Sequence, residues 1–142
     1  MKKTKIFLLL LSLTFAASKI NVKAIDGFMG YSGVTLNSSK NDYITRGPVA
    51  KTQESAQHYH NTGTVGNYSG NQIKMRARVK DADNGGTSSW VTFSQGQTKS
   101  FGSNNFTIYM GNYKIHLSRN SSSLVGEKAT HSGLWYLNEN LM

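Results

Sequence analysis

The clearest structural signal in this 142-residue chain is an alternation of apolar and basic residues. Between Gln72 and Asp81, four apolar residues alternate with four cations: Ile73, Met75, Ala77 and Val79 with Lys74, Arg76, Arg78 and Lys80. Successive side chains of a β-strand point to opposite faces of its sheet. The period of two therefore predicts a half-buried strand with one apolar face and one basic face.

A turn and a returning strand are predicted directly after this segment. Residues Asp81–Gly86 contain Asn-Gly and Gly-Gly, which tolerate the positive φ angles of tight turns. Ser89–Ser94 then carries aromatic and β-branched residues that are typical of a strand. We expect the two strands to form an antiparallel hairpin.

Short alternating segments separated by glycine, asparagine and serine continue along the chain. They predict further strands at Phe28–Leu36, Thr98–Phe101, Phe106–Met110, Tyr113–Leu117 and His131–Asn138, with a break at Gly111-Asn112. Gly30 and Gly33 lie inside the first of these strands, which we expect to bulge. About seven short strands at roughly 8–12-residue spacing predict an all-β domain, either an antiparallel β-sandwich or a small barrel.

Helical structure is barely indicated. Val49–His60 is the best candidate, but it lacks a sustained apolar stripe at helical spacing. Gly63, Gly66 and Gly70 follow it and indicate a loop or a weakly paired strand. Seven aromatic residues on or beside the predicted strands are assigned to the core, namely Trp90, Phe93, Phe101, Phe106, Tyr109, Tyr113 and Trp135.

The N-terminal residues have the pattern of a secretory signal peptide. Three lysines within the first five residues precede an apolar run from Ile6 to about Ser18, and Val22-Lys23-Ala24 places small residues around a cleavage site. The apolar run is shorter than the ~20 residues that cross a bilayer. We expect residues 1–24 to be removed and residues 25–142 to form a single secreted domain without a transmembrane segment.

Composition refines this expectation. The chain has no cysteine, whereas small exported eukaryotic domains usually depend on disulfides, so a bacterial source is favoured. The lysine-rich start and leucine-rich run favour export from a Gram-positive cell. Loss of residues 1–24 would leave 11 basic and 7 acidic residues, a net charge of +4 instead of +9. A moderately cationic protein meets anionic partners more readily.

The basic face of the alternating strand is the candidate binding site. Lys74, Arg76, Arg78 and Lys80 would lie about 7 Å apart on one face, where like charges repel one another. The binding hypothesis is an anionic envelope component such as teichoic acid, a lipid surface or a receptor. Nucleic acid is not expected, because the protein is exported and few aromatic residues interleave with the cations. The alternative is a solvated face, or edge lysines that deter aggregation.

Other chemistry finds little support. His58 and His60 would face the same way on a strand and could chelate a metal with His116 or His131. Two exposed imidazoles beside a packed tyrosine are the favoured explanation, and no metal or cofactor is expected. Asp81 and Asp83 flank the predicted turn and are assigned to it. No nucleophile motif or cysteine is present, so no catalytic residue is assigned and the protein is not expected to be an enzyme.

Three stretches carry a resemblance to known proteins: Val91–Gln97, Tyr113–Asn120 and Ser132–Glu139. In these the chain resembles a family of small secreted Gram-positive proteins of unknown function, although Asn138-Glu139 stands where that family has a more acidic ending. Gly133-Leu134-Trp135 is similar to a motif of bacteriocins of the lactococcin 972 type, which are cationic, cysteine-free and β-rich; this chain is longer and lacks their overall pattern. Neither resemblance implies a catalytic residue.

These observations lead to one functional expectation with two alternatives. The first is a secreted, non-enzymatic binding protein that acts at the cell envelope through its cationic strand face, in a bacteriocin-like or surface-binding role. The second is a self-assembling structural or surface interaction protein. The third is an envelope hydrolase whose carboxylates are brought together only by the fold.

Overall fold

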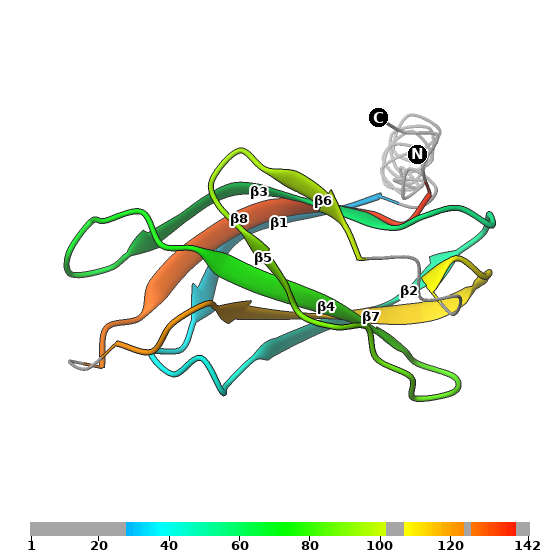
Figure 1. Ribbon diagram of the computed structural model, residues 1–142, viewed down its shortest axis with the longest axis horizontal. Coiled ribbons are helices and arrows are strands. Elements are labelled where there is room, and N and C mark those ends of the chain that lie inside the picture. Colours follow the sequence, from blue (N-terminus) through cyan, green and yellow to red (C-terminus); the bar gives the residue numbers. More distant parts are fainter. Residues whose placement is uncertain (1–27, 102–106, 124–125, 139–142) are drawn as a thin grey trace, which may run out of the picture.

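Two antiparallel sheets pack face to face in the computed structural model, which describes residues 28–101, 107–123 and 126–138. Figure 1 shows the two layers, with β3 and β8 in one and β4 and β7 in the other. The described residues contain eight strands: β1 Phe28–Leu36, β2 Ile44–Lys51, β3 His58–Gly66, β4 Met75–Asp81, β5 Val91–Phe93, β6 Thr98–Ser100, β7 Gly111–Arg119 and β8 Ala129–Tyr136. The predicted all-β sandwich is confirmed. The predicted signal peptide, residues 1–24, lies outside the described residues.

The strand order is β1-β8-β3-β6 in the first sheet and β2-β7-β4-β5 in the second. Strand β8 forms long ladders with both β1 and β3, and β7 forms long ladders with both β2 and β4. The C-terminal third of the chain therefore supplies the strand that joins the two longest pairings of each sheet. None of the described residues belongs to a helix long and apolar enough to cross a membrane.

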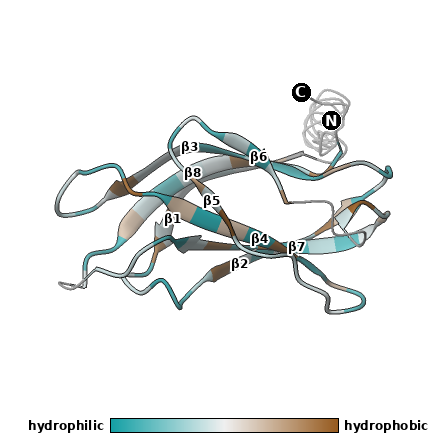
Figure 2. Cartoon of the chain, in the orientation of Figure 1, coloured by the Kyte–Doolittle hydropathy of each residue, from teal (hydrophilic) through white to brown (hydrophobic). Residues whose placement is uncertain are grey.

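The alternation along β4 is confirmed in three dimensions. Met75, Ala77 and Val79 are fully buried between the sheets, whereas Arg76, Arg78 and Lys80 are half-buried on the other face. The banding of β4 in Figure 2 follows this pattern. The predicted hairpin also forms, because β4 pairs antiparallel with β5 after a turn.

The core lies between the sheets and is aromatic. Phe93, Phe101, Tyr113 and Trp135 are buried, as predicted. The core assignment is wrong for Trp90, which lies on the outer face of the second sheet, and for Tyr109, which is 54% exposed in the loop before β7. Phe106 lies outside the described residues.

A polar network runs through this core. The Tyr59 hydroxyl lies 2.6 Å from His131 Nε2, and Thr64 Oγ1 lies 2.7 Å from His131 Nδ1. Thr64 Oγ1 donates to Asn61 Oδ1 at 3.2 Å, so it accepts from His131 Nδ1–H, and His131 Nε2 accepts from Tyr59. Burial lowers the pKa of His131 from 6.5 to about 4, which keeps the imidazole neutral in this role.

Several boundaries differ from the sequence-based predictions. Val49–His60 is not helical: it contains the end of β2 and the start of β3. The predicted strand Phe106–Met110 is wrong, since the described residues 107–110 form turns. The predicted break at Gly111-Asn112 is also wrong, because these residues pair with Lys51 and Ala50 of β2 and begin β7.

The outermost long strand of each sheet is irregular. The expected bulge of β1 is present between Tyr31 and Val34, where Gly33 has a φ of 65°. Strand β2 shifts register between Arg46 and Val49, around Gly47. Gly47 has a φ of 99°, and a Cβ there would lie 2.8 Å from a backbone oxygen of β7, so glycine is required.

Candidate functional site

Strand β4 places its cations on the outer face of the second sheet. Arg76, Arg78 and Lys80 alternate with core residues, and Lys74 is exposed one residue before the strand begins. Ladder pairing extends to Lys74, whose carbonyl accepts the Asn120 amide at 2.9 Å. All four residues of the sequence-based candidate therefore belong to the same row.

The register of β7 adds a fifth cation to this face. Paired residues of neighbouring strands point to the same side, and Lys114 is the direct partner of Lys80. His116 and Ser118 are in the same way the partners of Arg78 and Arg76. We call Lys74, Arg76, Arg78, Lys80 and Lys114 the cationic band.

Two aromatic side chains lie among these cations. The guanidinium carbons of Arg76 and Arg78 lie 4.4 Å and 4.6 Å from the centre of the Trp90 ring. The Arg78 guanidinium is also 5.4 Å from the centre of the Tyr43 ring. Contacts of this kind hold a guanidinium through its interaction with the ring's electron-rich face. Both arginine head groups are therefore positioned before any ligand arrives.

His116 completes the support of Arg78. Its ring stacks on Tyr43 with the centres 4.2 Å apart, and its Nδ1 accepts a 3.1 Å hydrogen bond from Arg78 Nε. Burial, together with the charges of Arg78, Lys80 and Lys114, lowers the pKa of His116 to about 4. A neutral imidazole can accept this bond at near-neutral pH, so it orients Arg78 without adding positive charge.

Arg76 is held by backbone as well as by Trp90. Its terminal Nη2 donates to the carbonyl oxygen of Lys40, in the loop before β2. Burial, followed by the nearby charge of Arg78, lowers the pKa of Arg76 below its usual value. Its Nε is buried and finds no hydrogen-bond partner within the described ranges. None of the contacts described for Arg76 or Arg78 is with a carboxylate.

Three of the acidic residues, Asp81, Asp83 and Glu127, are engaged in turns. The Asp81 carboxylate accepts the backbone amides of Asp83 and Asn84 at 2.8 and 3.0 Å, which lowers its pKa although burial acts in the opposite direction. The Asp83 carboxylate accepts the Asn112 amide at 3.2 Å. Glu127 accepts the Ser69 amide at 2.8 Å in the loop between β3 and β4. These carboxylates stabilise turns instead of neutralising the band.

The histidine hypothesis does not bring a third ligand to His58 and His60. Both lie on β3 and face the same way, and His60 Nδ1 is 2.8 Å from Thr98 Oγ1. His116 belongs to the other sheet, and His131 is inside the core. Within the part of the chain that the structure describes, no three metal-ligating side chains come together.

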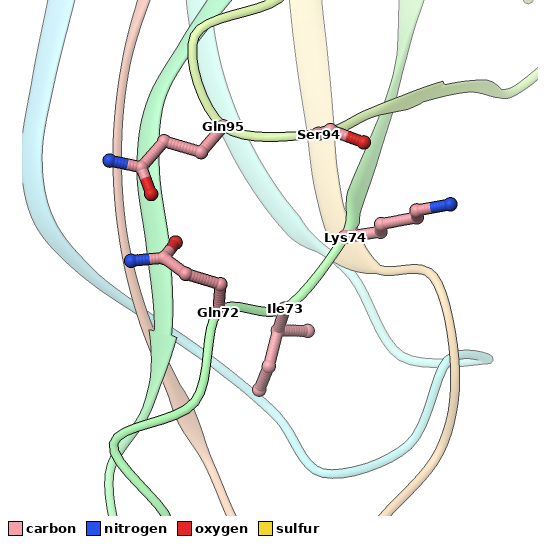
Figure 3. Close-up of a pocket in the computed structure, with 5 residues that line it drawn as sticks. All are labelled: Gln72, Ile73, Lys74, Ser94 and Gln95. Carbon is pink, nitrogen blue, oxygen red and sulfur yellow. The ribbon is translucent and has the colours of Figure 1, made fainter.

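An open pocket of about 180 Å³ lies at the Lys74 end of the band. Gln72, Ile73, Ser94 and Gln95 line it together with Lys74. Figure 3 shows the carboxamides of Gln72 and Gln95 on one side and the side chains of Lys74 and Ser94 on the other. The pocket thus joins hydrogen-bonding groups to one end of the cationic band.

Sequence reasoning missed four members of this face: Tyr43, Trp90, Lys114 and His116. The sequence did contain a signal for Trp90. Trp90 and Thr92 are two residues apart, so they point to the same face, opposite to Val91 and Phe93, and Thr92 is the partner of Arg76. Lys114 and His116 join the face through strand register, which local alternation does not determine, and Tyr43 lies one residue before β2.

Neither a protein-family model nor a curated protein matches this chain.

Proposed function

We propose that this protein is exported and acts as a non-enzymatic binding protein at the cell envelope, where it binds an anionic component through the cationic band. One observation carries the proposal: five cations share one sheet face, and the contacts described for the two arginines are with rings, an imidazole and a carbonyl. A face that only needed solubility would not require arginine head groups fixed in this way.

The energetics support a ligand. Unit charges about 7 Å apart repel by about 0.6 kcal/mol even in water, and more where they are half-buried. Lys80 and Lys114 are direct cross-strand partners, an arrangement that destabilises a sheet when the charges are alike. A bound anion would convert this repulsion into attraction.

The envelope location follows from the expected export of residues 25–142 and from the absence of cysteine in the sequence. The resemblance of Val91–Gln97 and Ser132–Glu139 to small secreted Gram-positive proteins favours the same location. The similarity of Gly133-Leu134-Trp135 to a motif of lactococcin 972-type bacteriocins favours a bacteriocin-like form of this function.

Self-assembly through sheet edges is the less favoured alternative. Strands that pair with a second copy are typically long and regular, whereas bulges blunt an edge against pairing. The long outermost strands β1 and β2 both contain an irregularity, at Gly33 and at Gly47-Pro48.

Binding of purified protein to Gram-positive cell walls and to anionic vesicles, at NaCl concentrations between about 0.05 and 0.5 M, tests the proposal. We expect binding that weakens steeply with salt and that falls in the double variant Lys74→Ala/Lys80→Ala. The matched control is Arg46→Ala/Lys128→Ala, which removes the same charge from exposed positions outside the band. Salt-independent binding, or an equal loss in both double variants, would overturn the proposal.

A further inference from the structure

The shape of the cationic band carries an inference about the ligand that rests on the proposed function. Lys74 and Lys80 are separated by six residues of extended chain, about 20 Å. Between them the cations follow at intervals of about 7 Å, and Lys114 adds a second cation beside Lys80. The band is therefore long and narrow.

A small anion cannot contact both ends of such a band. A ligand that uses all five cations must repeat its negative charge along one direction. We infer that the ligand is a linear phosphodiester polymer that lies along β4, with one phosphate between Lys80 and Lys114 and neighbouring phosphates on Arg78 and Arg76.

The arginine geometry favours phosphate. Arg78 binds His116 through Nε, so its two terminal nitrogens are the donors that face outward from this contact. Planar guanidinium groups bind the paired oxygens of phosphate in a two-point arrangement that lysine cannot reproduce. Trp90 and Tyr43 restrict the guanidinium groups beforehand, which reduces the entropy lost on binding.

The same contacts argue against nucleobases and against a bilayer. Arg76 and Arg78 both lie over the Trp90 ring, and His116 stacks on Tyr43, so these rings are already engaged by the protein. Arg76, Arg78 and Lys80 are half-buried, and the two arginines lie over the Trp90 ring. A single polymer chain can follow them, whereas a flat layer of head groups reaches mainly side chains that project.

Calorimetric titration of the purified protein with four probes tests the inference. The probes are lipid-free poly(glycerol phosphate), oligothymidylate as a second phosphodiester polymer, hyaluronate as a carboxylate polymer, and phosphatidylglycerol vesicles. We expect both phosphodiester polymers to bind, with hyaluronate at least about tenfold weaker. Four phosphate contacts predict a slope of log affinity against log salt near −3.

Two double variants locate the contacts. Arg76→Lys/Arg78→Lys keeps the charge but removes the two-point geometry, and we expect about tenfold weaker binding of the polymer. Lys80→Gln/Lys114→Gln relieves like-charge repulsion, so it should fold at least as stably as the parent. Because these two lysines share one phosphate, the salt slope should become shallower by about 0.7.

Three results would overturn the inference: vesicles bind but the lipid-free polymer does not, hyaluronate binds as tightly as the polymer, or neither double variant changes polymer binding. The first two results would leave an anion-binding function in place. Loss of the proposed function itself has a separate signature, because then none of the probes would show salt-dependent binding.

Discussion

Acidification from pH 7 to pH 4 should destabilise the fold. Within the core, the main cause is protonation of His131. Its Nε2 accepts the Tyr59 hydroxyl and its Nδ1 donates to Thr64, so the neutral imidazole has a partner at both ring nitrogens. Protonation would place a second donor opposite Tyr59 inside a fully buried site.

The size of the effect follows from the two pKa values. His131 has a pKa of about 4 in the fold against 6.5 in the unfolded chain, so the unfolded state takes up the proton first. The stabilisation that neutral His131 provides is complete above pH 6.5. It is lost as the pH falls, and the loss in the free energy of unfolding reaches about 3 kcal/mol near pH 4. His116, with a pKa of about 4, acts in the same direction. Domains of this size have only about 5–15 kcal/mol to lose.

Urea denaturation at intervals between pH 7 and pH 4 measures this loss. The parent should lose stability with a slope that approaches about 2.7 kcal/mol per pH unit if both histidines contribute, and about half of that in His131→Gln. The glutamine variant should be less stable at pH 7 by about 1–3 kcal/mol, since it cannot reproduce both hydrogen bonds. The control is His60→Gln, which removes a histidine from outside the core. A parent whose stability is the same at pH 7 and pH 4, or a His131→Gln protein with the full parental slope, would refute this reasoning.

Three further predictions address the core, the site and export. Gly133→Ala should destabilise the fold by roughly 1–3 kcal/mol in thermal unfolding, because its Cβ would collide with the Tyr59 hydroxyl. The control Gly63→Ala has open space around the new Cβ and should change stability far less. Equal losses in the two variants would argue against the collision. Trp90→Ala should weaken polymer binding by removing the ring beneath both arginines, at a cost of roughly 0.5–2 kcal/mol in stability; unchanged binding would show that the ring support is unimportant. N-terminal sequencing of protein from culture medium should begin at Ile25, and an uncleaved start at Met1 would contradict the expected export.

The elements that local sequence could predict are those with strict alternation. Strand β4 and its hairpin with β5 were predicted because apolar and basic residues alternate without interruption and a glycine-rich turn follows. Strand β2 was missed, and β3 was left open as a loop or a weakly paired strand, since Gly47, Pro48 and the glycines after His60 hide their alternation. Their positions depend on pairing with β7 and β8, which lie far along the chain.

The candidate site divides in the same way. The row from Lys74 to Lys80 is visible in consecutive residues, so its shared face followed from the period of two. His116 reaches Arg78 across 38 residues of sequence, and Lys114 faces Lys80 only because β4 and β7 pair in this register. Such partners become visible only when the register is known.

The most direct test of the cationic band is a residue-resolved NMR titration of the isotopically labelled protein with lipid-free poly(glycerol phosphate). We expect the largest shifts in the Nε–H signals of Arg76 and Arg78 and in the backbone amides of Arg76, Arg78, Lys80 and Lys114, on β4 and β7. Shifts centred on the first sheet, around Lys99 or Lys128, or spread evenly over all exposed cations, would contradict this expectation.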